Sequence, residues 1–474
     1  MPTASAGFLL FSAAVAIACN LSRHPLWRGW VLLAANLAYL ATVSTDPSAF
    51  LPFAAFLAIG YAAILASGRR RSGKVLGTLV MALTLGFCWL KKYWFLSGLG
   101  FISSPYVTIG LSYIFFRVMH LVIDAQSHRE AGRLSFLSYL NYTLNFTALV
   151  AGPIQRYEDF LKTPPPIDLC IAGRAAERIV IGLFKVLVVA ALLSTVQTQA
   201  TADLLAHHDG PDRLKSGLVA IAGYPIYLYF NFSGYMDIVI GVARFIGMEL
   251  PENFNRPFSS VNFIEFWGRY HMTLSNWLRD YVYTPLLRVL MTRFPKPGRD
   301  PFLATLAFFV TFFLIGIWHG PTAIFATYGV LLAVGISGDK LYQTALLKLW
   351  GRRKYRALAE DPVYRAVCRG LTFTWYAVSM LCFWADSDEA SRILGALGPG
   401  GIAAVFLLLL VAATAALTVT ETLRAAALDA GWKGRPIMLS RYTRTVWSVV
   451  LAFLCVSVAM LMHSPAPDIV YKTF

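Results

Sequence analysis

The segment LIGIWHGPTAI, residues 314–324, places His319 between two apolar runs, residues 302–318 and 324–336. Both runs are long enough to lie in a bilayer, and Gly320-Pro321 predicts a break in the helix between them. An imidazole at such a break is costly to desolvate, and ionisable residues inside a membrane are commonly functional. The other interpretation is structural: the His319 ring would form a hydrogen bond with a backbone carbonyl at the helix end. The neighbours of His319 favour a functional role. Trp318 can pack against one side of the imidazole, and the break in the helix leaves room for a second molecule.

The composition predicts an all-α, polytopic integral membrane protein. Of the 474 residues, 57% are hydrophobic and only 14% are charged, whereas about a quarter of the residues of soluble domains are charged. The formal net charge of +16 would suit a nucleic-acid partner. However, the basic residues lie in alternate loops, as the positive-inside rule requires, so no nucleic acid is expected. The six cysteines include no pair with metal-ligand spacing, so we expect neither disulfides nor a metal site.

Twelve apolar runs predict about 11–12 transmembrane helices, some of them short. The runs lie near residues 8–20, 30–43, 50–67, 75–96, 106–124, 179–199, 214–247, 302–318, 322–338, 367–385, 401–420 and 445–462. The basic loops that are expected to face the cytoplasm are residues 69–74, 129–178, 256–299, 340–369 and 424–444. Lys91-Lys92 departs from this pattern.

Two segments on the predicted cytoplasmic side are too polar or too broken for ordinary spans. Residues 136–150 are half apolar and end at Ala151-Gly152-Pro153, which suits a re-entrant or interfacial helix. Residues 262–287 carry an apolar stripe at helical spacing among basic residues, which predicts an amphipathic helix lying at the interface. The stripe consists of Trp267, His271, Leu274, Leu278 and Tyr281.

Polar side chains occur inside two predicted spans. Arg117, His120 and Asp124 are three and four residues apart and share one helix face. They form either the wall of a polar path from the cytoplasm or an Arg–Asp pair that joins two helices. Ser233 and Asp237 share a face of a later span, where hydrogen bonds between helices are again the alternative.

Four stretches resemble the membrane-bound O-acyltransferase (MBOAT) family, and in particular its bacterial alginate O-acetyltransferase branch. They are NFSGYMDIVIGVARFIGMELPENFNRPF to YTPL at 231–286, IGLSYIFFR at 109–117, AGPIQRYEDF at 151–160 and IGIWHG at 315–320. The branch that transfers D-alanine to teichoic acids is similar too, and weaker similarity covers nearly the whole chain. Three places depart from the family's pattern. Tyr270 stands where the family usually has tryptophan, Pro321-Thr322 replaces a smaller pair after His319-Gly320, and residues 470–474 fit the aromatic ending of relatives only loosely.

The resemblance implies one membrane domain, residues 1–474, with re-entrant and interfacial helices around a central tunnel. Residues 1–130 would form N-terminal spans, 131–340 the catalytic core and 341–474 C-terminal spans. It also implies a bacterial inner-membrane location and cytoplasmic acetyl-CoA as donor substrate, with no bound cofactor. The acceptor would be a hydroxyl of an extracytoplasmic polysaccharide, and a periplasmic partner of the SGNH-hydrolase type often completes such a transfer.

In the family, the histidine that matches His319 is the catalytic residue, and the one that matches His271 lies near the cytoplasmic opening. A neutral imidazole suits a general base at cellular pH. Amides at the Gly320-Pro321 break or the Trp318 indole are candidate oxyanion donors. The candidate tunnel-lining residues are Trp318, Asn231, Ser233, Asp237, Asn255, Trp267, Asp280, Arg117, His120 and Asp124, and the candidate donor-binding residues are Arg156, Arg269 and Arg279.

Two other functions remain open on the sequence alone. The same fold can use a D-alanyl thioester on a carrier protein as its donor. Alternatively, a non-catalytic transporter of acyl groups or glycans would use His319 for gating or proton relay. The chain shows no matching pair of broken helices in its two halves, which argues against the transporter.

Overall fold

The structure is a computed structural model that describes residues 1–22, 24–126, 134–163, 165–206, 210–296, 298–429, 431–432, 435–436 and 440–462. The expected basic loop residues 129 and 133 and the C-terminal residues 470–474 lie outside this described part. The described residues are almost entirely helical, apart from the two-residue strands β1 (Gly431–Trp432) and β2 (Arg435–Pro436), which pair antiparallel. The chain divides into two compact units. The first contains Met1–Val186 and Phe232–Glu252, and the second contains Leu187–Asn231 and Asn253–His463.

Eight helical stretches in the described part have the length and hydropathy of a membrane span. They are Pro47–Arg69, Gly73–Leu90, Leu169–Ala206, Gly210–Ile246, Asp300–His319, Ile324–Glu360, Pro362–Trp384 and Ser387–Asp429. The expectation of an all-α, multi-pass membrane protein is confirmed. The larger predicted count also includes α1 (Ala6–Asn20), α2 (Pro25–Ala41), α5 (Leu111–Asp124) and α19 (Arg441–Met462). The first three of these have 15, 17 and 14 residues, fewer than the roughly 20 that cross a bilayer upright.

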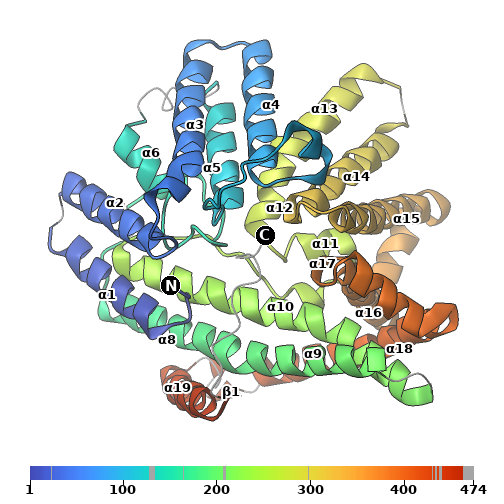
Figure 1. The fold of residues 1–474 in the computed structure, drawn as a ribbon. Coiled ribbons are helices and arrows are strands. Elements are labelled where there is room, and N and C mark those ends of the chain that lie inside the picture. The colour runs from blue at the N-terminus through green and yellow to red at the C-terminus, as the bar shows by residue number, and fades with distance from the viewer. Residues whose placement is uncertain are drawn as a thin grey trace. The chain divides into compact units, whose positions relative to one another are not determined.

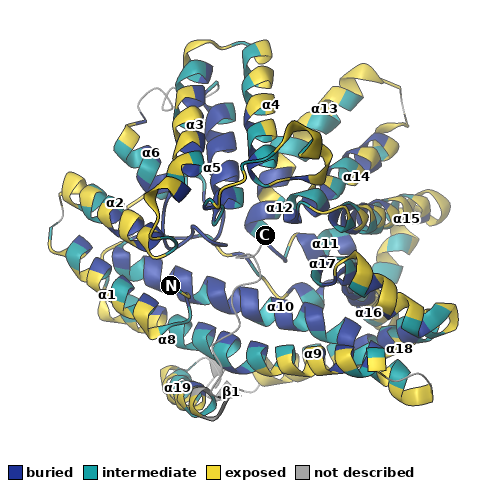
Figure 2. Cartoon of the chain, in the orientation of Figure 1, coloured by how far each residue is buried: buried dark blue, intermediate teal, exposed yellow. Residues whose placement is uncertain are grey.

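The burial pattern fits a bilayer environment. In α18 (Ser387–Asp429) only 17% of the most apolar window is buried, and Leu407, Val411 and Val419 are among its exposed residues. A soluble surface rarely exposes so much contiguous apolar area. In α10 (Gly210–Ile246), by contrast, 72% of the corresponding window is buried, and Figure 2 shows this contrast in colour.

The first unit is organised around α5. Helices α3 (Leu51–Arg69) and α4 (Gly73–Leu90) of this unit pack on α5, as Figure 1 shows. Nearly every residue of α5 is buried. The unit also contains α1, α2, the short helices η1 (Pro47–Phe50), η2 (Trp94–Leu99), α6 (Phe136–Thr143) and α7 (Tyr157–Phe160), α8 (Leu169–Phe184) and the end of α10. The chain enters α5 through Gly110, whose φ of 74° favours glycine.

The predicted interfacial helix at 136–150 is shorter than expected. Helix α6 ends at Thr143, and residues 144–155 continue as buried, irregular chain. Such backbone needs hydrogen-bond partners from the protein. The Asn36 Oδ1 accepts from the Phe146 amide at 2.8 Å, and Arg117 donates to the Ala148 carbonyl at 2.7 Å. The segment is therefore held by long-range polar contacts, which local periodicity does not reveal.

The second unit contains the helices that position His319. It begins in the π-helical segment η4 (Lys185–Ala190) and includes α9 (Ala191–Ala206), the start of α10, η5 (Pro257–Ser259), α11 (Phe263–Trp267), α12 (Met272–Leu278), the π-helical turn η6 (Arg279–Tyr283), α13 (Thr284–Arg293), α14 (Asp300–His319), α15 (Ile324–Glu360), α16 (Pro362–Ser379), α17 (Leu381–Trp384), α18 and α19. Helices α14 and α15 form a close hairpin (Figure 1). Glycines at 316 and 329 meet where they cross, and a Cβ on Gly316 would overlap the Gly329 backbone.

The single amphipathic helix predicted for 262–287 is wrong. The segment is divided into α11, α12, η6 and α13, and the break between the first two lies at Gly268–His271. His271 has φ 48°, ψ 49°, a left-handed conformation that no continuous right-handed helix contains. Trp267 and Leu274 therefore belong to different helices, and the apparent stripe does not form one helix face.

Candidate active site

His319 is the last residue of α14, and aromatic rings of the second unit surround its imidazole. It is 4% exposed. The ring centroids of Trp318, Phe383 and Tyr328 lie 4.8, 5.0 and 5.7 Å from the centroid of the imidazole. These rings come from α14, α17 and α15. The sequence predicted the tryptophan, but it gave no sign of the other two, because helices distant in the chain supply them.

Helix α14 ends at His319. Gly320 is extended, with φ −168° and ψ 158°, and Pro321 lacks the amide that a further helical turn needs. A Cβ on Gly320 would overlap the ring of Phe325, so the side-chain-free residue is required at this point. The predicted helix break is confirmed, and it fixes the imidazole at the end of α14.

His271 is the second buried imidazole of this site. It is 1% exposed, precedes α12, and its ring lies 6.5 Å from the Trp318 indole. The indole therefore contacts both imidazoles. This places the two candidate catalytic histidines in one site.

Asn253 orients the His271 ring. The Asn253 Oδ1 accepts hydrogen bonds from the Thr273 amide at 3.0 Å and from the Thr273 hydroxyl at 2.8 Å. The same oxygen lies 3.3 Å from the His271 Nδ1. Because an amide oxygen only accepts, Nδ1 carries the proton in this arrangement, and Nε2 is the basic nitrogen. Asn253 was not among the predicted site residues, since it lies 18 residues from His271.

Burial lowers the pKa of His271 to about 3. In an unfolded chain a histidine takes up its proton near pH 6.5, so acid favours the unfolded state between pH 6.5 and 3. The stabilisation is complete above pH 6.5 and decreases as the pH falls, by about 2 kcal/mol at pH 5.

We therefore expect the His271→Gln variant to lose stability less steeply than the wild type between pH 7 and 5. Glutamine retains an amide donor and does not titrate. Thermal-inactivation half-lives in detergent at a series of pH values would measure the two slopes. Equal slopes would show that His271 does not carry this pH dependence.

The other predicted residues of the second unit are in different surroundings. Trp267, on α11, is 3% exposed and its ring lies 5.3 Å from Phe312. Asn231 on α10 is fully buried, and neither polar atom of its side chain has a hydrogen-bond partner within the described part of the chain. Asn255 is exposed, and its amide donates to the Arg269 carbonyl at 2.8 Å. Asp280 is half exposed and accepts from Arg279 Nε at 2.9 Å.

In the first unit, Arg117, His120 and Asp124 lie on α5, but Arg117 does not pair with Asp124. The Arg117 guanidinium is 1% exposed and donates to the carbonyls of Tyr142 at 3.3 Å, Thr143 at 3.0 Å and Ala148 at 2.7 Å. The interpretation as an Arg–Asp pair is therefore wrong, because the guanidinium binds carbonyls of the last two residues of α6 and of the irregular chain that follows.

His120 is the partner of Asp124. The His120 Nδ1 lies 3.1 Å from the Asp124 Oδ2, and its Nε2 lies 2.6 Å from the Tyr142 hydroxyl. This hydroxyl donates in turn to the Gln155 carbonyl at 2.6 Å. Arg156 follows at the start of α7. A chain of polar contacts thus runs from a partly exposed carboxylate into the interior of the first unit.

Asp237 joins two helices of the first unit. Its carboxylate accepts from Arg178 Nε at 3.0 Å and from Lys185 Nζ at 2.7 Å. Arg178 also forms a bidentate pair with Glu252. Ser233 lies on α10, as Asp237 does, and is buried. These contacts of Asp237 agree with the alternative in which the polar residues of this span form hydrogen bonds between helices. The sequence analysis did not identify Arg178 and Lys185 as the partners.

The chain is similar to known proteins over its central part. The profile of the membrane-bound O-acyltransferase family matches residues 74–383, about two thirds of the chain. A teichoic acid D-alanyltransferase of Bacillus subtilis (strain 168) is 30% identical over 233 residues, which are 48% of this chain and 57% of that protein.

Two further relatives differ in name. A probable alginate O-acetylase of Pseudomonas syringae pv. tomato is 31% identical over 237 residues, 49% of this chain and 42% of that protein. A peptidoglycan O-acetyltransferase of Helicobacter pylori is 31% identical over 226 residues, 45% and 39% of the two chains. The match thus spans about half the length of these relatives. The profile match confirms the resemblance seen in the sequence, and the chain belongs to the membrane-bound O-acyltransferase family.

Proposed function

We propose that this protein transfers an acetyl group from cytoplasmic acetyl-CoA to a hydroxyl on the far side of a bacterial inner membrane. The acceptor is a polysaccharide, or a periplasmic SGNH-hydrolase-type partner that passes the group on. Family membership and the acetyl-transferring relatives support this assignment. The observation that carries it is the buried imidazole of His319 at the end of a membrane helix, beside a second buried imidazole.

The proposed reaction is direct acyl transfer with His319 as general base. The acceptor oxygen attacks the thioester carbon while the imidazole takes the hydroxyl proton, and a tetrahedral intermediate forms. The carbon–sulfur bond then breaks, the proton passes to the leaving thiolate, and the products are an oxygen ester and free coenzyme A. Such proton transfer by a positioned side chain contributes about 10²–10⁴-fold to the rate.

The aromatic rings around His319 support this role. A site lined by rings excludes water, and electrostatic interactions are stronger there than in solution. The Gly320 amide donates to the Ile317 carbonyl at 3.3 Å, so it is already used inside the last helical turn. Of the two expected oxyanion donors, the Trp318 indole N–H therefore fits the proposal better.

Acyl transfer can be tested with the purified full chain in liposomes, radiolabelled acetyl-CoA and acceptor polysaccharide, with and without an SGNH-type partner. We expect label in an alkali-labile ester and one free thiol released for each ester formed. Label that crosses the bilayer without forming an ester would support the transporter and contradict the proposal.

The second candidate donor is a D-alanyl thioester on a carrier protein. It is favoured by the 30% identity to the Bacillus teichoic acid D-alanyltransferase. The same assay distinguishes it, because acetyl-CoA alone would then label nothing, and only the D-alanyl carrier protein would support ester formation.

A further inference from the structure

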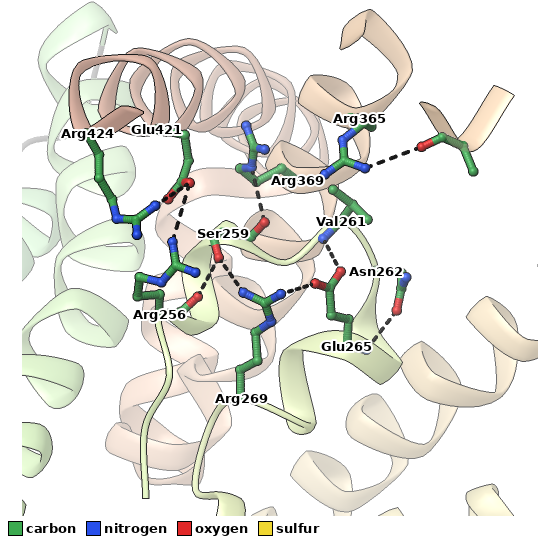
Figure 3. A network of polar contacts seen from close by, with 11 residues as sticks. Arg256, Ser259, Val261, Asn262, Glu265, Arg269, Arg365, Arg369, Glu421 and Arg424 are labelled. Atoms are coloured by element: carbon green, nitrogen blue, oxygen red, sulfur yellow. Dashed lines mark hydrogen bonds and ion pairs between the residues drawn. The ribbon is translucent and has the colours of Figure 1, made fainter. Parts of the chain in front are cut away.

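We infer that five arginines of the second unit bind the phosphate groups of coenzyme A. Arg256, Arg269, Arg365, Arg369 and Arg424 form the arginine cluster in Figure 3. This inference rests on the proposed function, since it assigns the donor's charged end. Of the expected donor-binding residues, it includes Arg269.

Ser259 connects two members of the arginine cluster. Its hydroxyl accepts from Arg269 Nη1 at 2.9 Å, and its carbonyl accepts from Arg369 Nε at 3.3 Å. Arg269 also pairs with Glu265 at 2.7 Å. These contacts hold the guanidinium groups of α16 and of the loop before α12 beside the short helix η5.

The other members leave an excess of positive charge. Arg256 and Arg424 share the Glu421 carboxylate at 3.9 and 3.7 Å. Arg365 donates to the Ala359 carbonyl at 3.5 Å, and neither it nor Arg369 pairs with a carboxylate within the described residues. Five arginines therefore face two glutamates, and the cluster has an excess of three positive charges.

This charge and chemistry fit phosphate. All five cations are arginines, whose planar forks match phosphate oxygens with paired hydrogen bonds. Coenzyme A carries a diphosphate and a 3′-phosphate, which would neutralise the excess and relieve repulsion between neighbouring guanidinium groups. Arg269 is 29% exposed, and Arg256 and Arg424 are 45% and 42% exposed, so a dissolved anion can reach the cluster.

The backbone links the arginine cluster to the candidate active site. Segments 253–256 and 269–272 pair antiparallel: the Asn255 amide donates to the Arg269 carbonyl at 2.8 Å, and the Met272 amide donates to the Asn253 carbonyl at 2.9 Å. One end of this pair carries Arg256 and Arg269, and the other carries Asn253 and His271. Arg269 and His271 are two residues apart, and two residues span at most about 7 Å even when the chain is fully extended.

Arg256 adds a second observation at the charged end. With φ 49° it is one of three non-glycine residues with positive φ in the described part, and His271 is another. Both ends of the paired segments thus hold a functional side chain in a backbone conformation that glycine adopts more easily. This provides a sharp test, because glycine at 256 removes the charge and relieves the strain.

The test measures binding of coenzyme A to the purified full chain, together with the KM values of acetyl-CoA and of acetyl-pantetheine, which lacks the phosphates. The variant is Arg256→Gly combined with Arg369→Gln. Each lost charge-assisted hydrogen bond should weaken binding about tenfold. We expect the Kd of coenzyme A and the KM of acetyl-CoA to rise at least tenfold and the KM of acetyl-pantetheine to stay unchanged. Arg353→Gln, exposed on α15 outside the arginine cluster, is the matched control and should bind as the wild type does.

The outcomes separate this inference from the proposed function. Variant binding equal to that of the wild type, with acyl transfer intact, overturns the inference alone. Arginine-dependent binding of coenzyme A without ester formation supports the inference and overturns the function. Binding of only a phosphopantetheinylated carrier protein, or arginine dependence seen only with anionic lipid in the bilayer, overturns coenzyme A as the ligand.

Discussion

His319→Ala should lower kcat for acyl transfer by about 10²–10⁴-fold and leave the Kd of coenzyme A nearly unchanged. In the proposed mechanism the imidazole acts on the proton of the attacking hydroxyl, so its loss would raise the energy of the transition state and leave binding of the donor unchanged. Alanine at the last residue of α14 leaves the Gly320-Pro321 break in place, so the helix should still end at the same residue. Steady-state kinetics in liposomes, with expression and monodispersity as checks on folding, would measure this.

His271→Ala is the matched comparison. Its ring is also buried beside Trp318, but it lies two residues after Arg269, a member of the arginine cluster. We expect it to raise the KM for the donor more than it lowers kcat. If His319→Ala retains the kcat of the wild type, His319 is not the base and the transporter becomes the better explanation.

Arg117→Met should destabilise the protein strongly, even though the methionine side chain fills a volume similar to that of arginine. The guanidinium donates to three buried carbonyls between Tyr142 and Ala148. Each carbonyl left without a partner costs about 1–3 kcal/mol, so the loss should approach the whole stability of a typical domain. Fluorescence-detected size-exclusion chromatography after a heat series would show a large fall in the midpoint temperature.

Asp124→Asn provides the control for this prediction. If Arg117 and Asp124 formed an ion pair, neutralising both would be less harmful than neutralising Arg117 alone. Because Asp124 contacts His120, and Arg117 donates to carbonyls at the end of α6 and just after it, we expect no rescue in the double variant. A double variant more stable than Arg117→Met would contradict these contacts.

The sequence predicted features that depend on local patterns. Apolar runs of sufficient length identified the helices, and Gly320-Pro321 identified the end of α14 beside His319. These features follow from the properties of neighbouring residues. The family resemblance, now confirmed by the profile match, extended the prediction to the kind of chemistry.

Long-range contacts decided what the sequence missed. Helical spacing between Trp267 and Tyr281 suggested one helix, but pairing with residues 253–255 holds His271 in a left-handed conformation and interrupts it. The face shared by Arg117 and Asp124 was correct, while their partners come from α5 itself and from the end of α6 and the chain after it, 25 to 31 residues away. Periodicity reports which side of a helix a residue lies on, but not which distant group reaches it.

The contact between Gly316 and Gly329 limits how the protein can change during evolution or engineering. Main chain meets main chain there, one helical turn before His319, so no flexible side chain is available to absorb a new methyl group. A substitution at either glycine would displace the end of α14 and move the imidazole with it. New acyl or acceptor preferences should therefore arise through Phe383 or Tyr328, whose side chains can change size while the α14–α15 hairpin keeps the histidine in place.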